Sequence, residues 1–162
     1  MNIPVNTSTY TVVKATKADK KDILRFYKNQ RYSASYIGQD HCYIVKINNH
    51  IIASAIVSGG QISDNFWLLH ALVTDRAEQG KSIASLILQT IINDENENTK
   101  VRYEKIICFV DSELQQFYIK NHFSKYNTKG EISNLPVEFK QRLTRYREKQ
   151  HNLHCYLYSH FK

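Results

Sequence analysis

One stretch of the sequence has the residue types and spacing of an anion-binding site. Residues 72–88 begin as an apolar segment, pass through a polar turn that contains Gly80, and continue with the apolar spacing of an amphipathic helix. The first amides of a helix have no intrahelical partner, and the positive end of the helix dipole lies at the same place. A strand, a tight turn and a helix N-terminus therefore gather N–H groups around one spot. We infer a phosphate-bearing ligand held by the backbone.

The composition limits the class of protein. A chain of 162 residues with 42% hydrophobic residues fits one domain over residues 1–162 with a real core. The net charge of +7 favours an anionic partner, such as a phosphorylated cofactor, an acidic protein or RNA, but such a charge also keeps a protein soluble. Apolar runs are too short to span a bilayer, and residues 1–9 lack the pattern of a signal peptide. We predict a cytoplasmic protein with no membrane partner.

The cysteines favour burial over metal or redox chemistry. Their number is odd, and Cys42, Cys108 and Cys155 each lie in an apolar, strand-like run, which is typical of reduced, buried thiols. The pairs His41–Cys42 and His154–Cys155 are adjacent residues, which point to opposite faces of a strand. We therefore predict no metal site.

The elements before residue 72 must position the site. Residues 10–14 read as a strand, and Thr16 with Asp19 is a helix-start signal for a helix that ends near residue 29. Residues 31–39 have no clear period and are expected to form a loop or a short second helix, as a surface segment or, alternatively, at a substrate entrance. Two β-rich runs, 41–47 and 51–57, are joined by Asn48–Asn49, which suits a tight hairpin. The nearly continuous apolar run 66–74 predicts a central strand.

The elements after the turn predict a crossover unit. A helix over 83–93, a strand over 105–110 and a helix that starts at Asp111 or Ser112 and is closed by Phe123 follow one another. The strands 66–74 and 105–110 should therefore lie parallel and adjacent. The C-terminal part predicts an extended piece near 123–127, a turn at Lys129–Gly130, a helix from Pro136 to about residue 150, and a last strand, 153–161, that returns to the sheet.

These residues resemble a known family. Residues 72–84 resemble the acetyl-coenzyme A binding motif of the GCN5-related N-acetyltransferases (GNAT), which reads Arg or Gln, two residues, Gly, one residue, then Gly or Ala. Gln79, Ser82 and Ala84 occupy those positions. The order of elements is also similar. The resemblance implies an α/β (α+β) fold with a central mixed, mostly antiparallel sheet that contains a splayed parallel strand pair and is flanked by helices.

The resemblance also implies a cofactor site for acetyl-CoA. Backbone N–H groups of the turn and helix start would hold the pyrophosphate, and main-chain groups of the strand before it would hold the pantetheine arm. The residues concerned are Gln79, Gly80, Lys81, Ser82, Ile83 and Ala84 for the pyrophosphate, and Leu72, Val73 and Thr74 for the arm. Lys81 or Arg76 would add positive charge, and we expect the carboxylate of Glu78 to point away from the ligand.

Two residues are candidates for proton transfer. The resemblance assigns Tyr118 as the acid that protonates the departing thiolate, because Asp111, Leu114, Phe117, Tyr118 and Phe123 match the family's tyrosine helix; a core tyrosine is the alternative. His70 is the best candidate for a general base, because it is the titratable side chain of the buried strand, and a hydrogen-bonded core histidine is its alternative. Asp40, His41 and Asp64 could line the amine site.

The sequence departs from the family pattern at two glycines. Ser82 replaces the most regular one, so a Cβ and a hydroxyl lie beside the expected pyrophosphate and we expect lower affinity. His122 replaces the glycine after the tyrosine helix, so we expect a different helix cap.

The sequence therefore predicts an enzyme, an N-acetyltransferase that moves an acetyl group from acetyl-CoA to a primary amine. With no cysteine near the motif, we expect direct transfer in a ternary complex. The acceptor is open between a small metabolite, a peptide or protein amine, and aminoacyl-tRNA. Nucleic acid is not favoured, although residues 140–149 are basic, and a homodimer is left open. The alternative is a non-catalytic acyl-CoA-binding sensor or interaction module on the same fold.

Overall fold

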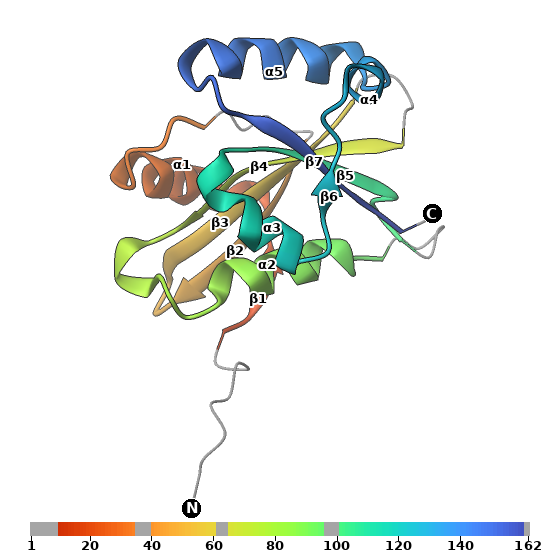
Figure 1. Cartoon of the computed structure of the whole chain (residues 1–162). Coiled ribbons are helices and arrows are strands. Elements are labelled where there is room, and N and C mark those ends of the chain that lie inside the picture. The colour runs from red at the N-terminus through yellow and green to blue at the C-terminus, as the bar shows by residue number, and fades with distance from the viewer. Residues whose placement is uncertain (1–9, 35–39, 61–64, 96–100, 161–162) are drawn as a thin grey trace, which may run out of the picture. The chain divides into compact units, whose positions relative to one another are not determined.

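The computed structural model describes residues 10–34, 40–60, 65–95 and 101–160. Its helices and strands are β1 (Val12–Lys14), a 3-10 turn (Lys17–Asp19), α1 (Lys20–Asn29), β2 (His41–Ile47), β3 (His50–Gly59), β4 (Phe66–Thr74), a 3-10 turn (Arg76–Glu78), α2 (Ile83–Ile92), β5 (Lys105–Val110), a 3-10 turn (Ser112–Leu114), α3 (Gln115–Lys120), β6 (Ser124–Lys125), α4 (Lys129–Ser133), α5 (Val137–Lys149) and β7 (His154–Ser159). Figure 1 shows these elements along the chain.

The strands form a mixed sheet in the order β1-β2-β3-β4-β5-β7-β6. β1 pairs antiparallel with β2, and β7 pairs antiparallel with both β5 and β6. The parallel pair is β4 with β5, in which Phe66 lies opposite Lys105 and Leu68 opposite Ile107. The predicted α/β fold, its parallel crossover and the return of the last strand are confirmed.

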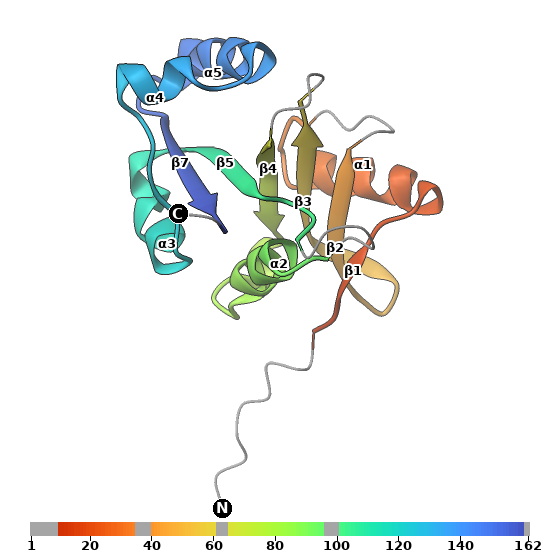
Figure 2. The same cartoon turned by 90° about the vertical axis from the view of Figure 1, so that its right-hand side faces the viewer.

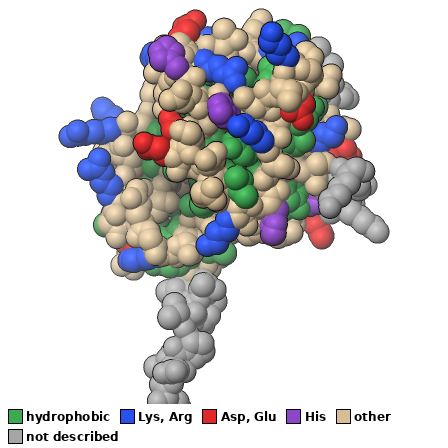
Figure 3. Space-filling view, in the orientation of Figure 1, with side chains coloured by type: hydrophobic (Ala, Val, Ile, Leu, Met, Phe, Trp, Pro, Cys, Tyr) green, Lys and Arg blue, Asp and Glu red, His purple; other side chains and the backbone are tan. Residues whose placement is uncertain are grey.

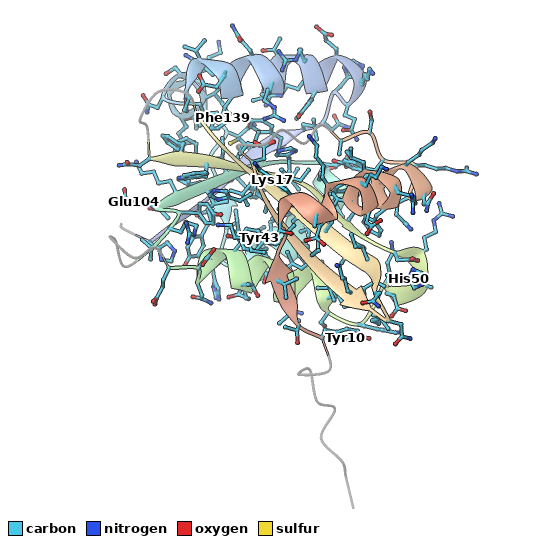
Figure 4. The ribbon with its side chains drawn as sticks, turned by 180° about the vertical axis from the view of Figure 1, so that it is seen from behind. Tyr10, Lys17, Tyr43, His50, Glu104 and Phe139 are labelled. Atoms are coloured by element: carbon cyan, nitrogen blue, oxygen red, sulfur yellow. The ribbon has the colours of Figure 1, made fainter. Side chains whose placement is uncertain are left out.

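The chain divides into two compact units, and the first comprises Met1–Ile56 and Ala71–Thr90. In this unit the apolar face of α1 packs on alternating residues of the strands, as Ile23 and Phe26 lie in one buried cluster with Ile44 and Ile56. Figure 2 shows α1 beside β2 and β3. Because side chains alternate along a strand, the buried Tyr43, labelled in Figure 4, lies on the other face.

Local signals place the first helix and the hairpin. The Thr16 N–H donates to the Asp19 carboxylate at 2.9 Å, as the predicted helix start requires. Asn48 and Asn49 have φ values of 50° and 66°, which are the left-handed conformations that a tight hairpin turn needs. Both predictions are confirmed.

The second unit comprises Val57–His70 and Ile91–Lys162. Its core joins the start of β4 to β5, β7 and the C-terminal helices through Leu68, Ile107, Cys155 and Phe139. Figure 4 labels Phe139 on the side of α5 that faces the strands. The division does not test the predicted single domain, which stays a prediction.

The predicted turn at Lys129–Gly130 is wrong, because α4 begins there. The Glu131 N–H donates to Thr128 Oγ1 at 3.1 Å, and the Thr128 N–H donates to the Glu131 carboxylate at 3.1 Å. This reciprocal capping box satisfies two amides at the helix start and outweighs the tendency of Gly130 to end a helix.

The three cysteines are buried and free, as predicted. Burial raises the pKa of the Cys42 thiol to about 11 and that of Cys155 to about 12, so both stay protonated. In the described part of the chain, no helix combines the length and apolarity needed to cross a bilayer.

Some predictions lie outside the described residues. Most of the loop predicted over 31–39 and the candidate Asp64 belong to this group, because residues 35–39 and 61–64 are not described.

Candidate functional site

The predicted anion-binding turn is a defined backbone structure in the first unit. Asp75 caps the 3-10 turn, since its carboxylate accepts a hydrogen bond from the Ala77 N–H at 3.0 Å. The chain then extends at Gln79 and reverses through Gly80, with φ of 83° and open space where a Cβ would stand. α2 follows within three residues, so its first amides lie next to this reversal.

Ser82 has a left-handed backbone conformation directly before α2. Its φ is 62°, which is left-handed and costs a non-glycine residue about 1–2 kcal/mol. Its carbonyl accepts the first helical hydrogen bond, from the Leu86 N–H at 3.1 Å. A serine at position 82 therefore still allows the left-handed turn into α2, and its Cβ and hydroxyl are exposed.

The charges of the turn partly neutralise one another. The Lys81 ammonium lies 2.8 Å from the Glu78 carboxylate, an exposed pair, and this contact raises the pKa of Lys81. Glu78 is thereby directed at Lys81. Arg76 is exposed and forms no ion pair with the described carboxylates.

The end of β4 presents its main chain in alternating directions. The Asp75 N–H donates to Ile52 O of β3 at 2.7 Å. Because main-chain groups alternate along a strand, those of Val73 also face β3, while those of Leu72 and Thr74 face away from it. In agreement with this, Thr74 O accepts a hydrogen bond from the Gln79 side chain at 3.3 Å. Val73 also packs its side chain against the core cluster.

A buried polar chain supports an irregular point in β4. Ala71 has a φ of 56°, although it lies inside a strand and has a Cβ. The Tyr27 hydroxyl of α1 donates to Ala71 O at 2.7 Å and lies 2.9 Å from Ser54 Oγ, which is 3.2 Å from Cys42 Sγ. A carbonyl can only accept, so the single Tyr27 proton goes to Ala71 and the Ser54 hydroxyl donates to Tyr27. Burial raises the pKa of Tyr27 well above its usual value, which keeps this donor protonated.

His70 lies one residue earlier on β4, in the second unit. It is half-buried, and its Nε2 lies 2.8 Å from Oγ of the buried Ser58. Burial, and secondly the positive charge of Arg142, lower the pKa of His70 to about 3. The imidazole is therefore neutral near neutral pH, and its lowered pKa makes it a weak base in the free protein.

Tyr118 also belongs to the second unit and lies on α3. It is buried, and its ring meets Phe117 and Phe123 edge-on at centroid distances of 5.0 and 5.5 Å. These contacts hold the phenol ring in one orientation. Leu114, which the sequence places on the same helix as Phe117 and Tyr118, is exposed in the 3-10 turn before α3.

The end of the tyrosine helix keeps the cap of a glycine-terminated helix, so the expected different cap is wrong. His122 has a φ of 72°; its N–H donates to Ile119 O at 3.0 Å, and the Phe123 N–H donates to Tyr118 O at 3.0 Å. These two bonds form a Schellman motif, which His122 completes in the left-handed conformation.

Three basic residues of α5 form hydrogen bonds with other parts of the chain or with their own helix. Lys140 donates to Ser133 O, Arg142 to the Tyr146 hydroxyl, and Arg147 to Leu153 O and Asn127. On the face shown in Figure 3, Lys and Arg side chains are spread among Asp and Glu side chains. This arrangement is typical of a solvated surface.

The predicted residues thus form two groups. The turn, the start of α2 and the end of β4 lie together in the first unit, while His70 and Tyr118 lie in the second. Sequence reasoning missed Tyr27 and Ser54 as supports of Ala71, and the effect of the Arg142 charge on the pKa of His70. Tyr27 looks like any member of the apolar stripe of α1, and no local signal marks an alanine with positive φ.

Comparisons with known proteins agree with this fold. The sequence matches no protein-family model, and no curated protein matches it significantly. An N-acetylglutamate synthase from Neisseria gonorrhoeae, solved with coenzyme A and N-acetyl-glutamate, is similar with a TM-score of 0.66 and 12% identity. A GNAT-family acetyltransferase from Staphylococcus aureus is similar with a TM-score of 0.64 and 15% identity, and one from Streptococcus pneumoniae with 0.64 and 10%.

The lengths covered differ among these structures. The match spans 94% of this chain but only 35% of the synthase, whereas it spans 93% of this chain and 98% or 99% of the two bacterial acetyltransferases. The chain therefore has the GNAT fold over most of its length. Identity at this level shows the fold alone.

Proposed function

We propose that this protein is an N-acetyltransferase that transfers an acetyl group from acetyl-CoA to a primary amine in a ternary complex. The observation that carries the proposal is the cradle of positive-φ residues, Gly80 and Ser82, directly before α2 in a chain with the GNAT fold. Two proteins of this fold, the synthase from Neisseria gonorrhoeae and Rv2747 from Mycobacterium tuberculosis, were solved with coenzyme A.

The chain's own residues fit the cofactor. The amides from Gln79 to Ala84 would hold the pyrophosphate at the helix N-terminus, although that of Gln79 also donates to Arg76 O at 3.4 Å, and Gly80 leaves room for close approach. The outward main-chain groups of Leu72 and Thr74 bind the pantetheine arm, while Val73 anchors this segment in the core. The side chain of Ile83 is buried, so its amide makes the contact. Bound acetyl-CoA supplies an electrophilic thioester carbonyl.

Tyr118 and His70 are the proposed proton donor and acceptor. The amine nitrogen forms a bond to the acetyl carbon while the carbon–sulfur bond breaks, and the departing thiolate takes the phenol proton of Tyr118. His70 accepts a proton from the amine, and the hydrogen bond between Ser58 and Nε2 keeps its ring oriented. The attack on the thioester carbon requires the amine to be neutral, because its lone pair forms the new bond.

The first test is binding. Acetyl-CoA and CoA should raise the melting temperature, because a ligand specific for the folded state stabilises it, and inorganic phosphate should raise it much less. A thiol-release assay with a panel of amines then measures transfer. No shift with either coenzyme at concentrations far above the expected dissociation constant would overturn the cofactor assignment.

Tyr118→Phe tests the proton donor. The ring contacts with Phe117 and Phe123 remain, so folding and CoA affinity should stay as in the parent protein while kcat falls about 10²-fold or more. Phe117→Leu is the matched control, which alters the same cluster without touching the phenol. An unchanged kcat in Tyr118→Phe would remove Tyr118 from the mechanism.

The alternative proposal is a non-catalytic acyl-CoA-binding sensor or interaction module. Ser82 and the low basicity of His70 favour it. This alternative predicts the same thermal shift with acetyl-CoA but no thiol release with any amine in the panel. A cytoplasmic location and a homodimer stay predictions.

A further inference from the structure

A side-chain hydrogen bond joins His70 to a buried serine on the neighbouring strand. Ser58 lies on β3, which is adjacent to β4 in the sheet, and its Oγ is 2.8 Å from His70 Nε2. Only 4% of Ser58 is exposed, whereas His70 is half-buried. Both residues belong to the second unit. The pair therefore has an interior end at the serine hydroxyl and an outer end at the imidazole.

The direction of this hydrogen bond follows from the partners that each atom has. Among the described residues, the Ser58 side chain makes no hydrogen bond other than the one to His70. If Nε2 donated to Oγ, the proton of the buried hydroxyl would have no acceptor, which costs about 1–3 kcal/mol. The Ser58 hydroxyl therefore donates to Nε2. A neutral imidazole carries one proton, so that proton is on Nδ1.

The Nδ1 atom of His70 is in contact with solvent. It has no hydrogen-bond partner in the described part of the chain, where every fully buried side-chain nitrogen and oxygen atom has a partner. Nδ1 is therefore not fully enclosed, and its proton can be donated to water. Burial lowers the pKa of His70 to about 3, which keeps the ring in its neutral form with a single N–H.

Atoms in this order can carry a proton from the interior to solvent. The lone pairs of Ser58 Oγ can accept from an amine, the Ser58 proton can pass to Nε2, and Nδ1 can release a proton to water. Because the ring gains one proton as it loses another, it does not have to stay charged, and a weakly basic imidazole is sufficient. The attacking nitrogen becomes positively charged as it bonds to the acetyl carbon, which makes its N–H more acidic than in the free amine.

We propose that Ser58 is a catalytic residue and that Ser58 and His70 form a proton relay from the acceptor amine to solvent. The amine proton goes to Ser58 Oγ, the Ser58 proton to His70 Nε2, and the Nδ1 proton to water. The acetyl carbon gains its bond to nitrogen and loses its bond to sulfur, which takes the proton of Tyr118. Tyr118 regains a proton from solvent, which balances the one released. This inference rests on the proposed acetyl transfer.

The tautomer of His70 tests the relay without turnover. Nitrogen-15 labelling of the histidines distinguishes protonated from unprotonated ring nitrogens by NMR, and His70→Leu identifies the His70 signals among the seven histidines. At neutral pH we expect Nδ1 to be protonated and Nε2 to be unprotonated. In Ser58→Ala the Nε2–H tautomer should appear, because no group then donates to Nε2. A parent protein with the Nε2–H tautomer overturns the inference.

Ser54→Ala is the matched control for this spectrum. Ser54 is also a buried serine of β3, but it contacts Tyr27 and Cys42 instead of His70. Its loss should leave the His70 signals unchanged. A tautomer change in Ser54→Ala equal to that in Ser58→Ala would contradict a specific effect of the Ser58 hydroxyl.

Turnover tests the passage of the proton through the hydroxyl. Ser58→Ala should lower kcat about 10²-fold or more while the affinity for CoA stays as in the parent protein. Ser58→Thr keeps a hydroxyl and should recover most of the lost kcat. A Ser58→Ala protein with the kcat of the parent, or an equal loss in both variants, overturns the relay. If Ser58→Ala fails to fold, the tautomer of the parent protein and the kcat of Ser58→Thr keep the inference open to refutation.

Failure of this inference and failure of the proposed function give different results. Thiol release that does not depend on Ser58 supports the proposed enzyme and overturns the relay. Binding of CoA without thiol release from any amine in the panel overturns the enzyme, and the relay with it, even where His70 has the expected tautomer. Thiol release that requires the hydroxyl, together with the Nδ1–H tautomer, supports both.

Discussion

Removal of the Tyr27 hydroxyl tests the conformation of the end of β4, the strand proposed to bind the cofactor. Tyr27→Phe keeps the buried ring and deletes the donor to Ala71 O. The carbonyl loses its 2.7 Å partner, and Ser54 loses the hydroxyl oxygen that lies 2.9 Å away. Leaving a buried acceptor unsatisfied costs about 1–3 kcal/mol, so we expect the free energy of unfolding to fall by about 2 kcal/mol. For a chain of this size that lowers Tm by roughly 4–8 °C.

The same change should weaken cofactor binding. The positive φ of Ala71 is an unfavourable conformation for alanine, and the Tyr27 bond restrains it. When that bond is lost, the segment relaxes and turns the main-chain groups of Leu72 and Thr74 away from their binding positions. We expect the dissociation constant of CoA to rise about tenfold, which corresponds to about 1.4 kcal/mol.

The assay combines chemical denaturation with calorimetric titration of CoA. Ser54→Ala is the control, because it removes a buried hydrogen bond but leaves the Tyr27–Ala71 bond in place. It should lower stability by about 1 kcal/mol while CoA affinity is retained. A Tyr27→Phe protein that binds CoA as tightly as the parent would refute the link between the Ala71 conformation and the cofactor.

Three other predictions concern single residues. Ser82→Gly should change the free energy of unfolding by less than about 1 kcal/mol, because relief of the left-handed strain offsets the greater chain entropy of glycine. The same change should strengthen CoA binding in calorimetry. Weaker binding would contradict the proposed pyrophosphate site at the turn before α2. His122→Gly should stabilise the protein by up to about 1 kcal/mol and His122→Val should destabilise it, as measured by denaturation; the reverse order would argue against the Schellman cap. The folded-state pKa of His70 is lowered to about 3 from 6.5, so its contribution to stability is present above pH 6.5 and is lost as the pH falls toward 3. Between these pH values the free energy of unfolding should fall with decreasing pH, and His70 should contribute up to about 1.4 kcal/mol per pH unit to this slope. In His70→Leu that contribution should be absent. An unchanged slope in acid denaturation would contradict the lowered pKa.

The features that the sequence predicted correctly depend on contacts between near neighbours. The Thr16–Asp19 helix start and the Asn48–Asn49 hairpin are formed within a few residues, so their signals can be read directly. The order of strands and the parallel crossover followed from apolar periodicity and from general rules of chain connection. The anion site at the Gly80 turn follows from the unpaired amides of a helix terminus and stays a prediction.

Two predictions from the sequence were wrong at helix ends, where two local signals compete. Gly130 indicated a turn, yet the capping box of Thr128 and Glu131 starts a helix across it. His122 indicated a different helix cap, yet it adopts the left-handed conformation that is usual for glycine and completes the two Schellman hydrogen bonds. In both places the hydrogen bonds that a terminus must satisfy outweigh the preference of one residue.

The sequence by itself determined the elements and their order, because hydrophobic periodicity and capping act over short distances along the chain. Only the tertiary structure decided the left-handed backbone conformation of Ala71 and the groups that act on His70. Tyr27 reaches Ala71 from 44 residues away, and Arg142 acts on His70 from a distant helix. Such contacts depend on how the elements pack, and no residue next to either site in the chain encodes them.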